Sequence, residues 1–191
     1  AEVFEQYRDK FKVVYTGAHG PANGLEVIIH AASIFQDRNL GIHFFLIGDG
    51  PDKDRLISVV KEKRLNNVSF LPPVPKALVP SILEKADLLV HTIKKMEVLQ
   101  YGMSPNKMYD YLASAKPIVT SIEAKNNPVE EANAGIAVEP ENPEALAEAI
   151  VKIYDLPEEK RIELGTNGRQ YVEQFYNIKN LATNLESLLG W

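Results

Sequence analysis

Along most of this chain, short apolar runs alternate with longer segments in which apolar residues repeat with the period of a helix. Each run has four to six residues and is bounded by polar residues, glycine or proline. Runs rich in β-branched and aromatic residues predict strands, and segments with apolar residues three and four positions apart predict helices. The predicted strands are residues 11–16, 42–47, 68–71, 87–91, 117–120 and 135–138. The predicted helices are residues 1–10, 25–35, 52–64, 77–84, 129–134, 143–154, 157–176 and 178–189, with a further short helix opening at Ser104.

The order of these elements indicates the fold class. Nearly continuous apolar strands that alternate with helices are typical of a parallel sheet covered on both faces. With right-handed crossovers, the pattern predicts an α/β fold: a doubly wound, Rossmann-like six-stranded parallel sheet with helices on both faces, ending in C-terminal helices. Ligands of such sheets bind outside the carboxyl ends of the strands. The loops expected at that edge are those at Gly17 and Gly48 and residues 72–75, 92–104 and 121–128.

The segment from Ser104 to Val119 carries the strongest chemical signal. Ser104 can cap a helix, Pro105 suits its first turn, and Lys107 and Asp110 then lie one turn apart on one face. A cation and a carboxylate near the partial positive charge of a helix N-terminus suit a phosphorylated sugar, with Lys107 for phosphate and Asp110 for hydroxyls. The alternative is a capped surface helix on which the two side chains form an ion pair.

A second signal is the glycine-rich connection that follows the first predicted strand. Gly17, Gly20 and Gly24 join a strand to a helix, where backbone N–H groups can approach a pyrophosphate. Ala18 and His19 break the dinucleotide-binding fingerprint, and no Gly-Lys-Ser/Thr closes a P-loop. His19 is a candidate donor to phosphate, or a solvated loop residue, and the glycines also suit a purely structural turn.

Other polar residues give weaker signals. Asp49 follows the second strand, as the ribose-binding acid of a dinucleotide enzyme would, but Asp49-Gly50-Pro51 reads better as a turn before a helix. Asp52 and Asp54 resemble a metal-binding Asp-x-Asp pair, yet both fall in the first turn of a helix, where the macrodipole favours acids. No metal site is therefore predicted.

The three remaining histidines and one long connection complete the candidates. His30, His43 and His91 have no ligand spacing and are expected to pack inside or at strand ends. Residues 94–103 form a long connection at the ligand edge, which is typical of a functional loop and equally of a solvated one.

Composition excludes several classes of function. The chain has 191 residues, of which 45% are hydrophobic and 25% charged, and its net charge of -5 argues against a general nucleic-acid binder. It contains no cysteine, which excludes disulfides and thiolate chemistry. No apolar run approaches the length of a membrane span, and the N-terminus lacks the form of a signal peptide. Because no methionine begins the chain, we expect a piece of a longer protein or a processed one.

Several segments, taken in order, resemble the C-terminal, donor-binding half of a family-four retaining glycosyltransferase with the GT-B fold. The resemblance is closest to bacterial polysaccharide enzymes similar to fucosamine transferases, and it covers nearly the whole chain. The matching segments are residues 13–17 with the glycine loop after them, 45–51, 67–71, 85–88, 104–119 and 135–143.

The resemblance implies roles for particular residues. In the paired-glutamate motif of the family, the second acid binds the ribose of the nucleotide, and Asp110 occupies its place. At the position of the first acid this chain has Gly102 instead. Ala18 and Asn23 stand where many members hold the diphosphate with an arginine and a lysine. Lys107 is therefore expected to take over this task and to stabilise the departing diphosphate. The residues expected to bind substrate are Gly17, His19, Gly20, Ser104, Asn106, Lys107 and Asp110.

The resemblance also implies a function. The chain is expected to bind a nucleoside-diphosphate sugar, uridine-linked, and to be the donor half of an enzyme of bacterial cell-surface polysaccharide synthesis that needs no metal or other cofactor. Residues 1–191 would form one domain, and the acceptor site would lie in an N-terminal domain that this chain lacks. The fragment alone is then expected to be inactive, and residues 175–191 either cross back to that domain or pack on their own. The whole enzyme is expected in the cytoplasm, with peripheral association at the inner face of the membrane.

Two alternatives remain open at this point. A sugar-nucleotide epimerase shares this architecture but needs acid and base residues that the sequence does not identify. A non-catalytic nucleotide-binding or interaction module on the same fold is the other, because a fold does not determine a function.

Overall fold

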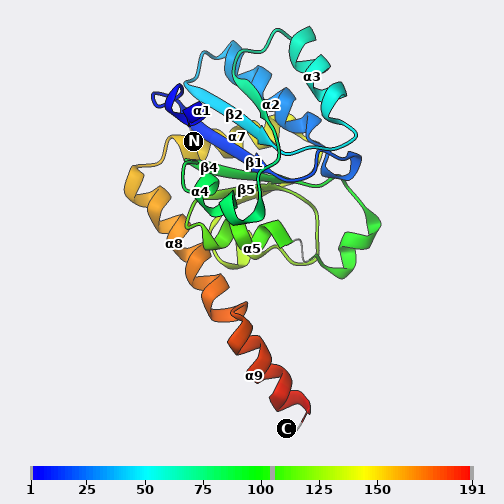
Figure 1. Ribbon diagram of the computed structural model, residues 1–191, viewed down its shortest axis with the longest axis vertical. Coiled ribbons are helices and arrows are strands. Elements are labelled where there is room, and N and C mark those ends of the chain that lie inside the picture. Colours follow the sequence, from blue (N-terminus) through cyan, green and yellow to red (C-terminus); the bar gives the residue numbers. More distant parts are fainter. Residues whose placement is uncertain (1, 104–105, 190–191) are drawn as a thin grey trace.

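The computed structural model describes residues 2–103 and 106–189 and contains a parallel sheet between layers of helices (Figure 1). The strands are β1 (Phe11–Thr16), β2 (Ile42–Ile47), β3 (Val68–Leu71), β4 (Leu88–Thr92), β5 (Ile118–Ser121) and β6 (Gly135–Val138). The α-helices are α1 (Glu2–Glu5), α2 (Glu26–Asp37), α3 (Lys53–Glu62), α4 (Val79–Leu83), α5 (Asn106–Ala113), α6 (Pro128–Glu131), α7 (Pro143–Tyr154), α8 (Glu158–Phe175) and α9 (Ile178–Leu189). Short 3₁₀ helices are η1 (Pro21–Asn23), η2 (Lys76–Leu78) and η3 (Glu97–Tyr101).

The sheet confirms the predicted fold class. Within the described residues, six strands form one sheet in the order β3-β2-β1-β4-β5-β6, and every neighbouring pair is parallel. The strand order reverses between β1 and β4, which is the switch point where ligands bind in doubly wound sheets. The carboxyl ends of β1 and β4 therefore mark the edge at which to look for a site.

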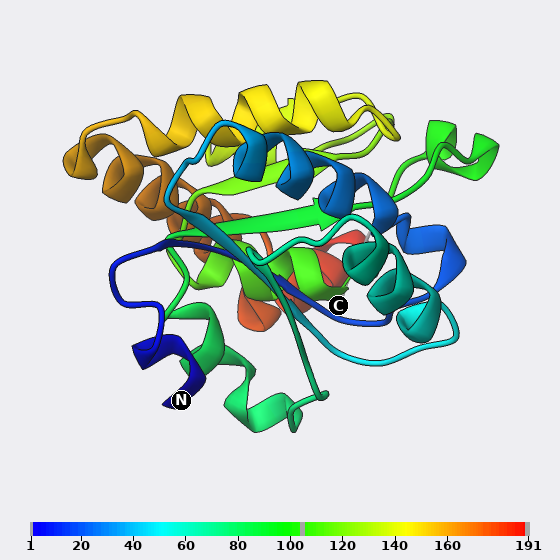
Figure 2. The same cartoon turned by 90° about the horizontal axis from the view of Figure 1, so that it is seen from above.

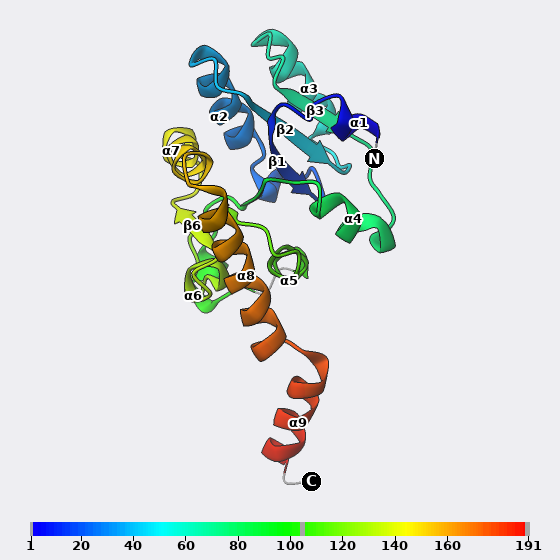
Figure 3. The ribbon, with the colours of Figure 1, turned by 90° about the vertical axis from the view of Figure 1, so that its left-hand side faces the viewer.

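Helices cover both faces of the sheet. One apolar core, which includes Ile28, Phe44 and Ile150, lies beneath α2, α3 and α7. The other core, which includes Phe45 and Met108, lies beneath α1, α4 and α5, and the two layers separate clearly in the views of Figures 2 and 3. The burial of alternate strand residues against both layers explains why the strands have almost no polar positions.

The structure differs from several predicted elements, and the predicted helix at residues 129–134 is the shorter α6, which ends at Glu131. The lead-in helix is only Glu2–Glu5, and the predicted helix at residues 77–84 divides into η2 and α4. This division follows from Pro80, which suits the first turn of α4 but not the interior of a longer helix. The long connection after β4 contains η3, which was predicted as loop.

The last two helices extend away from the sheet. α8 packs against α5, and α9 continues beyond it, so that the C-terminal end lies far from the strands (Figures 1 and 3). Leu185, Leu188 and Leu189 of α9 are each more than half exposed. None of the helices in the described part of the chain is long and apolar enough to span a membrane.

Candidate functional site

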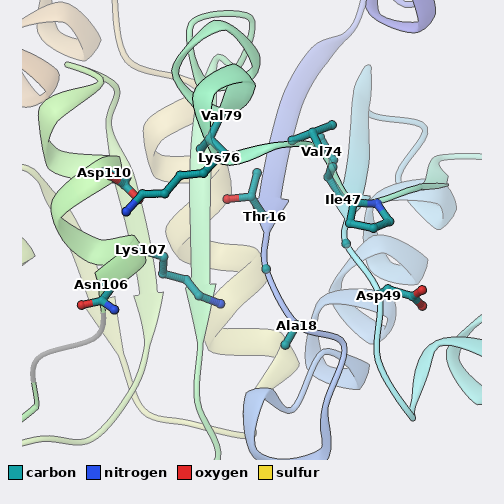
Figure 4. A pocket seen from close by; sticks show the side chains of 13 residues that line it. Thr16, Ala18, Ile47, Asp49, Val74, Lys76, Val79, Asn106, Lys107 and Asp110 are labelled. Carbon is teal, nitrogen blue, oxygen red and sulfur yellow. The ribbon is translucent and has the colours of Figure 1, made fainter.

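A cavity of about 580 Å³ opens at the carboxyl ends of β1, β2 and β3, facing the first turn of α5 (Figure 4). It collects three segments that are far apart in the sequence: the turn after β1, the turn after β2, and the β3–α4 connection. Its walls are Thr16, Gly17, Ala18, Ile47, Gly48, Asp49, Pro73, Val74, Lys76, Val79, Asn106, Lys107 and Asp110. The cavity therefore lies at the edge where the sequence placed the ligand.

Lys107 carries its cation to the wall formed by β1. Its Nζ donates a hydrogen bond to the Tyr15 hydroxyl at 2.8 Å and lies 4.3 Å from the centre of the Tyr15 ring. A Cβ built on Gly17 would lie only 2.6 Å from the same Nζ. Lys107 and the glycine turn are thus direct neighbours, as the sequence predicted, and Asp110 lines the same cavity from the next turn of α5.

The ammonium of Lys107 lacks a carboxylate partner within the described residues. None of their ion pairs includes it, so the alternative of a Lys107–Asp110 surface pair is wrong. Burial lowers the pKa of Lys107 to about 8. A cation that is partly removed from water and not neutralised by protein is prepared for an anionic ligand.

Two tyrosines fix the positions of Lys107 and the glycine turn, and neither tyrosine was predicted from the sequence. The Tyr15 hydroxyl, which accepts from Lys107, donates in turn to the carbonyl of Ala18 at 2.8 Å. The buried Tyr111 hydroxyl accepts a hydrogen bond from the Thr16 backbone N–H at 2.7 Å and thereby ties α5 to the end of β1. A signal was present, because Tyr111 stands four residues after Lys107 and so on the same face of a helix.

The turns after β1 and β2 pack into each other. The backbone N–H of Gly17 donates to Ile47 at 2.9 Å, and that of His19 donates to Asp49 at 2.8 Å. A Cβ on Gly48 would lie 1.8 Å from the carbonyl oxygen of Gly17, and Gly48 has a φ of +150°, so only glycine fits there. Lys53 closes the second turn by donating to the Gly48 carbonyl at 2.8 Å.

His19 is not placed at the cavity surface. Its side chain is fully buried behind the two turns, and neither ring nitrogen has a hydrogen-bond partner among the described residues. Burial, and then the nearby charge of Lys53, lower the pKa of His19 to about 4. The expectation of a solvated loop residue is therefore wrong, and Gly20 likewise does not line the cavity.

The remaining residues predicted for the site lie at the rim of the cavity or outside the described residues. Asn106 and Asp110 are exposed at the α5 side, and the Lys76 side chain reaches from the opposite side toward Asp110 (Figure 4). Asp49 lines the cavity at the end of β2. Ser104 lies outside the described residues.

The other candidate groups contact neighbouring side chains or lie in the core. Asp52 pairs with Arg55 at 3.6 Å, and within the described part of the chain no cluster of three acidic or histidine side chains could hold a metal ion. His43 and His91 are buried, as expected, whereas His30 is half-buried beside Glu26.

Comparison with known proteins agrees with this fold and family. Residues 10–155 match the model of the family described as glycosyl transferases group 1. WcaI of Escherichia coli K12, whose name describes a glycosyl transferase of colanic acid biosynthesis, is 29% identical over 173 residues. An alpha-D-kanosaminyltransferase of Streptomyces kanamyceticus is 25% identical over 162 residues. These matches cover 88% and 83% of this chain but only 40% of either relative.

Solved structures match the fold over almost the whole chain. The C-terminal domain of the group 1 glycosyl transferase LpcC from Francisella tularensis superposes with a TM-score of 0.74 at 19% identity, covering 91% of this chain and 92% of that domain. Anabaena HepE, crystallised with UDP-glucose, superposes with a TM-score of 0.79 at 18% identity, covering 99% of this chain and 51% of HepE. The match over residues 10–155 shows that the chain belongs to the family of glycosyl transferases group 1, and its fold is that of the C-terminal domain of LpcC.

Proposed function

We propose that the cavity binds the nucleoside-diphosphate part of a uridine-linked sugar donor, and that the chain is the donor half of a retaining glycosyltransferase of bacterial cell-surface polysaccharide synthesis. The observation that carries this proposal is the Lys107 ammonium, which lines the cavity beside Gly17 without a carboxylate partner among the described residues. Fold neighbours that were crystallised with UDP or UDP-glucose support the choice of nucleotide.

Each wall of the cavity has a proposed task. Lys107 binds the diphosphate together with the backbone N–H of Ala18, because the N–H groups of Gly17 and His19 already donate to the carbonyls of Ile47 and Asp49. Asp110 accepts hydrogen bonds from the ribose hydroxyls. Asn106 begins α5, where the helix dipole favours an anion, and Ser104, which lies outside the described residues, stays a proposed contact from the sequence alone. His19 and Gly20 shape the turn from behind rather than touching the nucleotide. Val74 and Val79 make the β3–α4 side of the cavity apolar, and this side is assigned to the base of the nucleotide.

The chemical contribution of these groups is electrostatic. When the bond between the sugar and the diphosphate breaks, negative charge grows on the leaving diphosphate. Lys107 and the N-terminal end of α5 are already oriented toward that charge, so they stabilise it without reorganisation at the moment of reaction. Lys107 is thus the residue proposed to act in catalysis.

The whole enzyme requires more than this chain, which spans about 40% of the length of its curated relatives. We propose that an additional N-terminal domain carries the acceptor site, and that α9 crosses to it with the exposed Leu185, Leu188 and Leu189. The isolated chain then binds the nucleotide and transfers nothing. We further propose that the whole enzyme works in the cytoplasm at the inner face of the membrane.

Calorimetric titration with UDP, UMP and NAD tests the proposed function. We expect UDP to bind more tightly than UMP, because the second phosphate reaches Lys107, and the variant Lys107→Met to lose about tenfold or more in UDP affinity. Lys61→Met is the matched control, since Lys61 is an exposed lysine on α3 that does not line the cavity. Preference for NAD, or equal UDP affinity in both variants, would contradict the proposal.

A further inference from the structure

The Tyr15 side chain lies between the Lys107 cation and the glycine turn. Tyr15 is the penultimate residue of β1, and its side chain is fully buried. Its hydroxyl contacts both neighbours at once, because it accepts from Lys107 Nζ at 2.8 Å and donates to the Ala18 carbonyl at 2.8 Å. The proposed function uses Lys107 and Ala18 for the diphosphate but gives Tyr15 no task.

The direction of these two hydrogen bonds follows from the chemistry of the groups. An ammonium only donates and a carbonyl only accepts, so the single hydroxyl proton points to Ala18 and a lone pair of the oxygen faces Lys107. Burial raises the pKa of the Tyr15 hydroxyl, and the nearby Tyr111 raises it further, so the hydroxyl keeps its proton at neutral and mildly alkaline pH. Tyr15 is therefore a neutral acceptor, which stabilises the ammonium without cancelling its charge.

The Tyr15 ring and the glycine turn enclose the ammonium from two further sides. Nζ lies 4.3 Å from the centre of the Tyr15 ring, whose face attracts a cation. Gly17 leaves the space that Nζ fills, since a Cβ there would lie only 2.6 Å from it. The cation is thus held at one place in the cavity wall.

Two buried histidines face the Lys107 cation, and neither carries charge at pH 7. On β4, burial and then the charge of Lys107 lower the pKa of His91 to about 3. Behind the turn after β1, burial is also the main cause that lowers the pKa of His19 to about 4, followed by the charge of Lys53. The charge of Lys107 contributes to both shifts, which places the two rings near it.

The polar groups of α5 do not compensate the cation either. Figure 4 shows the Asp110 side chain directed toward Lys76, whereas Lys107 extends toward the end of β1. Asp110 is exposed, and no ion pair within the described ranges joins it to Lys107. The Tyr111 hydroxyl is engaged with Thr16. In the part of the chain that the structure describes, the Tyr15 hydroxyl is therefore the group that stabilises the charged form of Lys107.

We propose that Tyr15 is the positioning residue for Lys107: its neutral hydroxyl keeps the ammonium charged and holds it beside the Ala18 end of the glycine turn. The inference rests on the proposed function and deepens it, because it assigns to one side chain of β1 the pH range over which the cation can bind a diphosphate. Without the hydroxyl the ammonium stays buried but loses its acceptor, so it should give up its proton at a lower pH.

NMR titration of Lys107 in the chain without nucleotide tests this role directly. Lysines labelled with ¹³C at Cε report their protonation, and Lys107→Met assigns the signal. Tyr15→Phe keeps the ring and removes only the hydroxyl, so we expect the titration midpoint of Lys107 to fall by about one pH unit. Tyr111→Phe is the matched control, because it removes an equally buried hydroxyl that bonds to Thr16, and it should leave the midpoint unchanged.

Calorimetry with UDP at several pH values measures the consequence for binding. Tyr15→Phe should bind UDP almost as tightly as the unaltered chain at about pH 6, where Lys107 is charged in both, and about tenfold more weakly at about pH 9. A purely structural role predicts a different result, namely a loss of affinity that is the same at every pH. Tyr111→Phe, which loosens the contact between α5 and β1, is expected to follow that second pattern.

The outcomes separate this inference from the proposed function. A Lys107 midpoint that does not move in Tyr15→Phe overturns the positioning role, and so does a loss of UDP affinity that is independent of pH. If UDP does not bind the unaltered chain, the nucleotide proposal fails, and the NMR titration still decides whether Tyr15 controls the charge of Lys107.

Discussion

At the scale of single residues, Lys107 combines a functional advantage with a cost in stability. Burial disfavours its charge, and the described residues offer the Tyr15 hydroxyl rather than a carboxylate in compensation. Proteins keep such groups where a ligand needs them, because an uncompensated charge otherwise destabilises the folded state.

Because the pKa of Lys107 is lowered, we expect both UDP affinity and the free energy of unfolding to depend on pH. Its ammonium is charged below a pKa of about 8 and loses the proton above it, so UDP affinity should fall as pH rises through 8, by up to about tenfold per pH unit. Between this pKa and the ordinary 10.5 the unfolded chain binds more protons, so the free energy of unfolding should rise across the same interval. Calorimetry and urea unfolding at several pH values measure both effects. Lys107→Met should show neither, and an unchanged pH response in that variant would assign the effect to another group.

His19 is expected to reduce stability, because both of its ring nitrogens are buried without partners in the described structure. Replacing the imidazole with an apolar side chain removes this penalty, so His19→Leu should raise the free energy of unfolding by about 1–3 kcal/mol. Urea unfolding measures the gain, and His30→Leu, at a half-buried site, is the control. UDP affinity should stay unchanged. A loss of affinity in His19→Leu would show instead that the imidazole contacts the ligand after a movement of the turn.

At the scale of elements, the site depends on how two turns and one helix meet. The turns after β1 and β2 are in backbone contact, and the Tyr111 hydroxyl fixes α5 to Thr16. The cavity wall is therefore made of backbone whose position is set by contacts between distant segments, which is the kind of support that keeps a binding site in one geometry.

Two glycines of these turns provide a matched comparison. In Gly48→Ala the new methyl group would meet the Gly17 carbonyl oxygen at 1.8 Å, so we expect a loss of about 2–3 kcal/mol in unfolding free energy together with weaker UDP binding. In Gly20→Ala the methyl group has open space, with no atom nearer than 3.9 Å, and the φ of -109° suits any residue. Thermal unfolding and UDP titration of both variants check the contrast. Equal effects at the two positions would disprove the packing of the turns as described.

At the scale of the whole molecule, α9 stands apart from the rest of the fold. Its leucines contribute little to the stability of this chain, because side chains that stay mostly exposed gain little free energy on folding. The combined change of Leu185, Leu188 and Leu189 to Gln should therefore leave the Tm of this chain within about a degree. In the whole enzyme the same change should lower sugar transfer, measured with radiolabelled UDP-sugar, while UDP binding persists. Unaltered transfer would argue that α9 does not cross to another domain.

The sequence by itself determined the architecture. Six strands and the longer helices were predicted to within one or two residues, because each carries a hydrophobic period that reflects its own burial. The sequence also determined at which edge of the sheet the cavity lies, since the carboxyl ends of parallel strands follow from chain direction. It indicated Lys107, Asp110 and Gly17 as neighbours at that edge. Elements without a strong period, such as α4 and η3, were predicted least well.

Only the tertiary structure decided how the neighbours are arranged. Tyr15 and Lys107 are 92 residues apart, so no local pattern could show that the hydroxyl meets the ammonium. Nor could it show that, among the described residues, Lys107 and Asp110 do not pair with each other. The burial of His19 depends on the turn after β2, which follows it by some thirty residues. Periodicity along a chain records whether a residue is buried, whereas the identity of its contacts is set by segments that folding brings together from elsewhere.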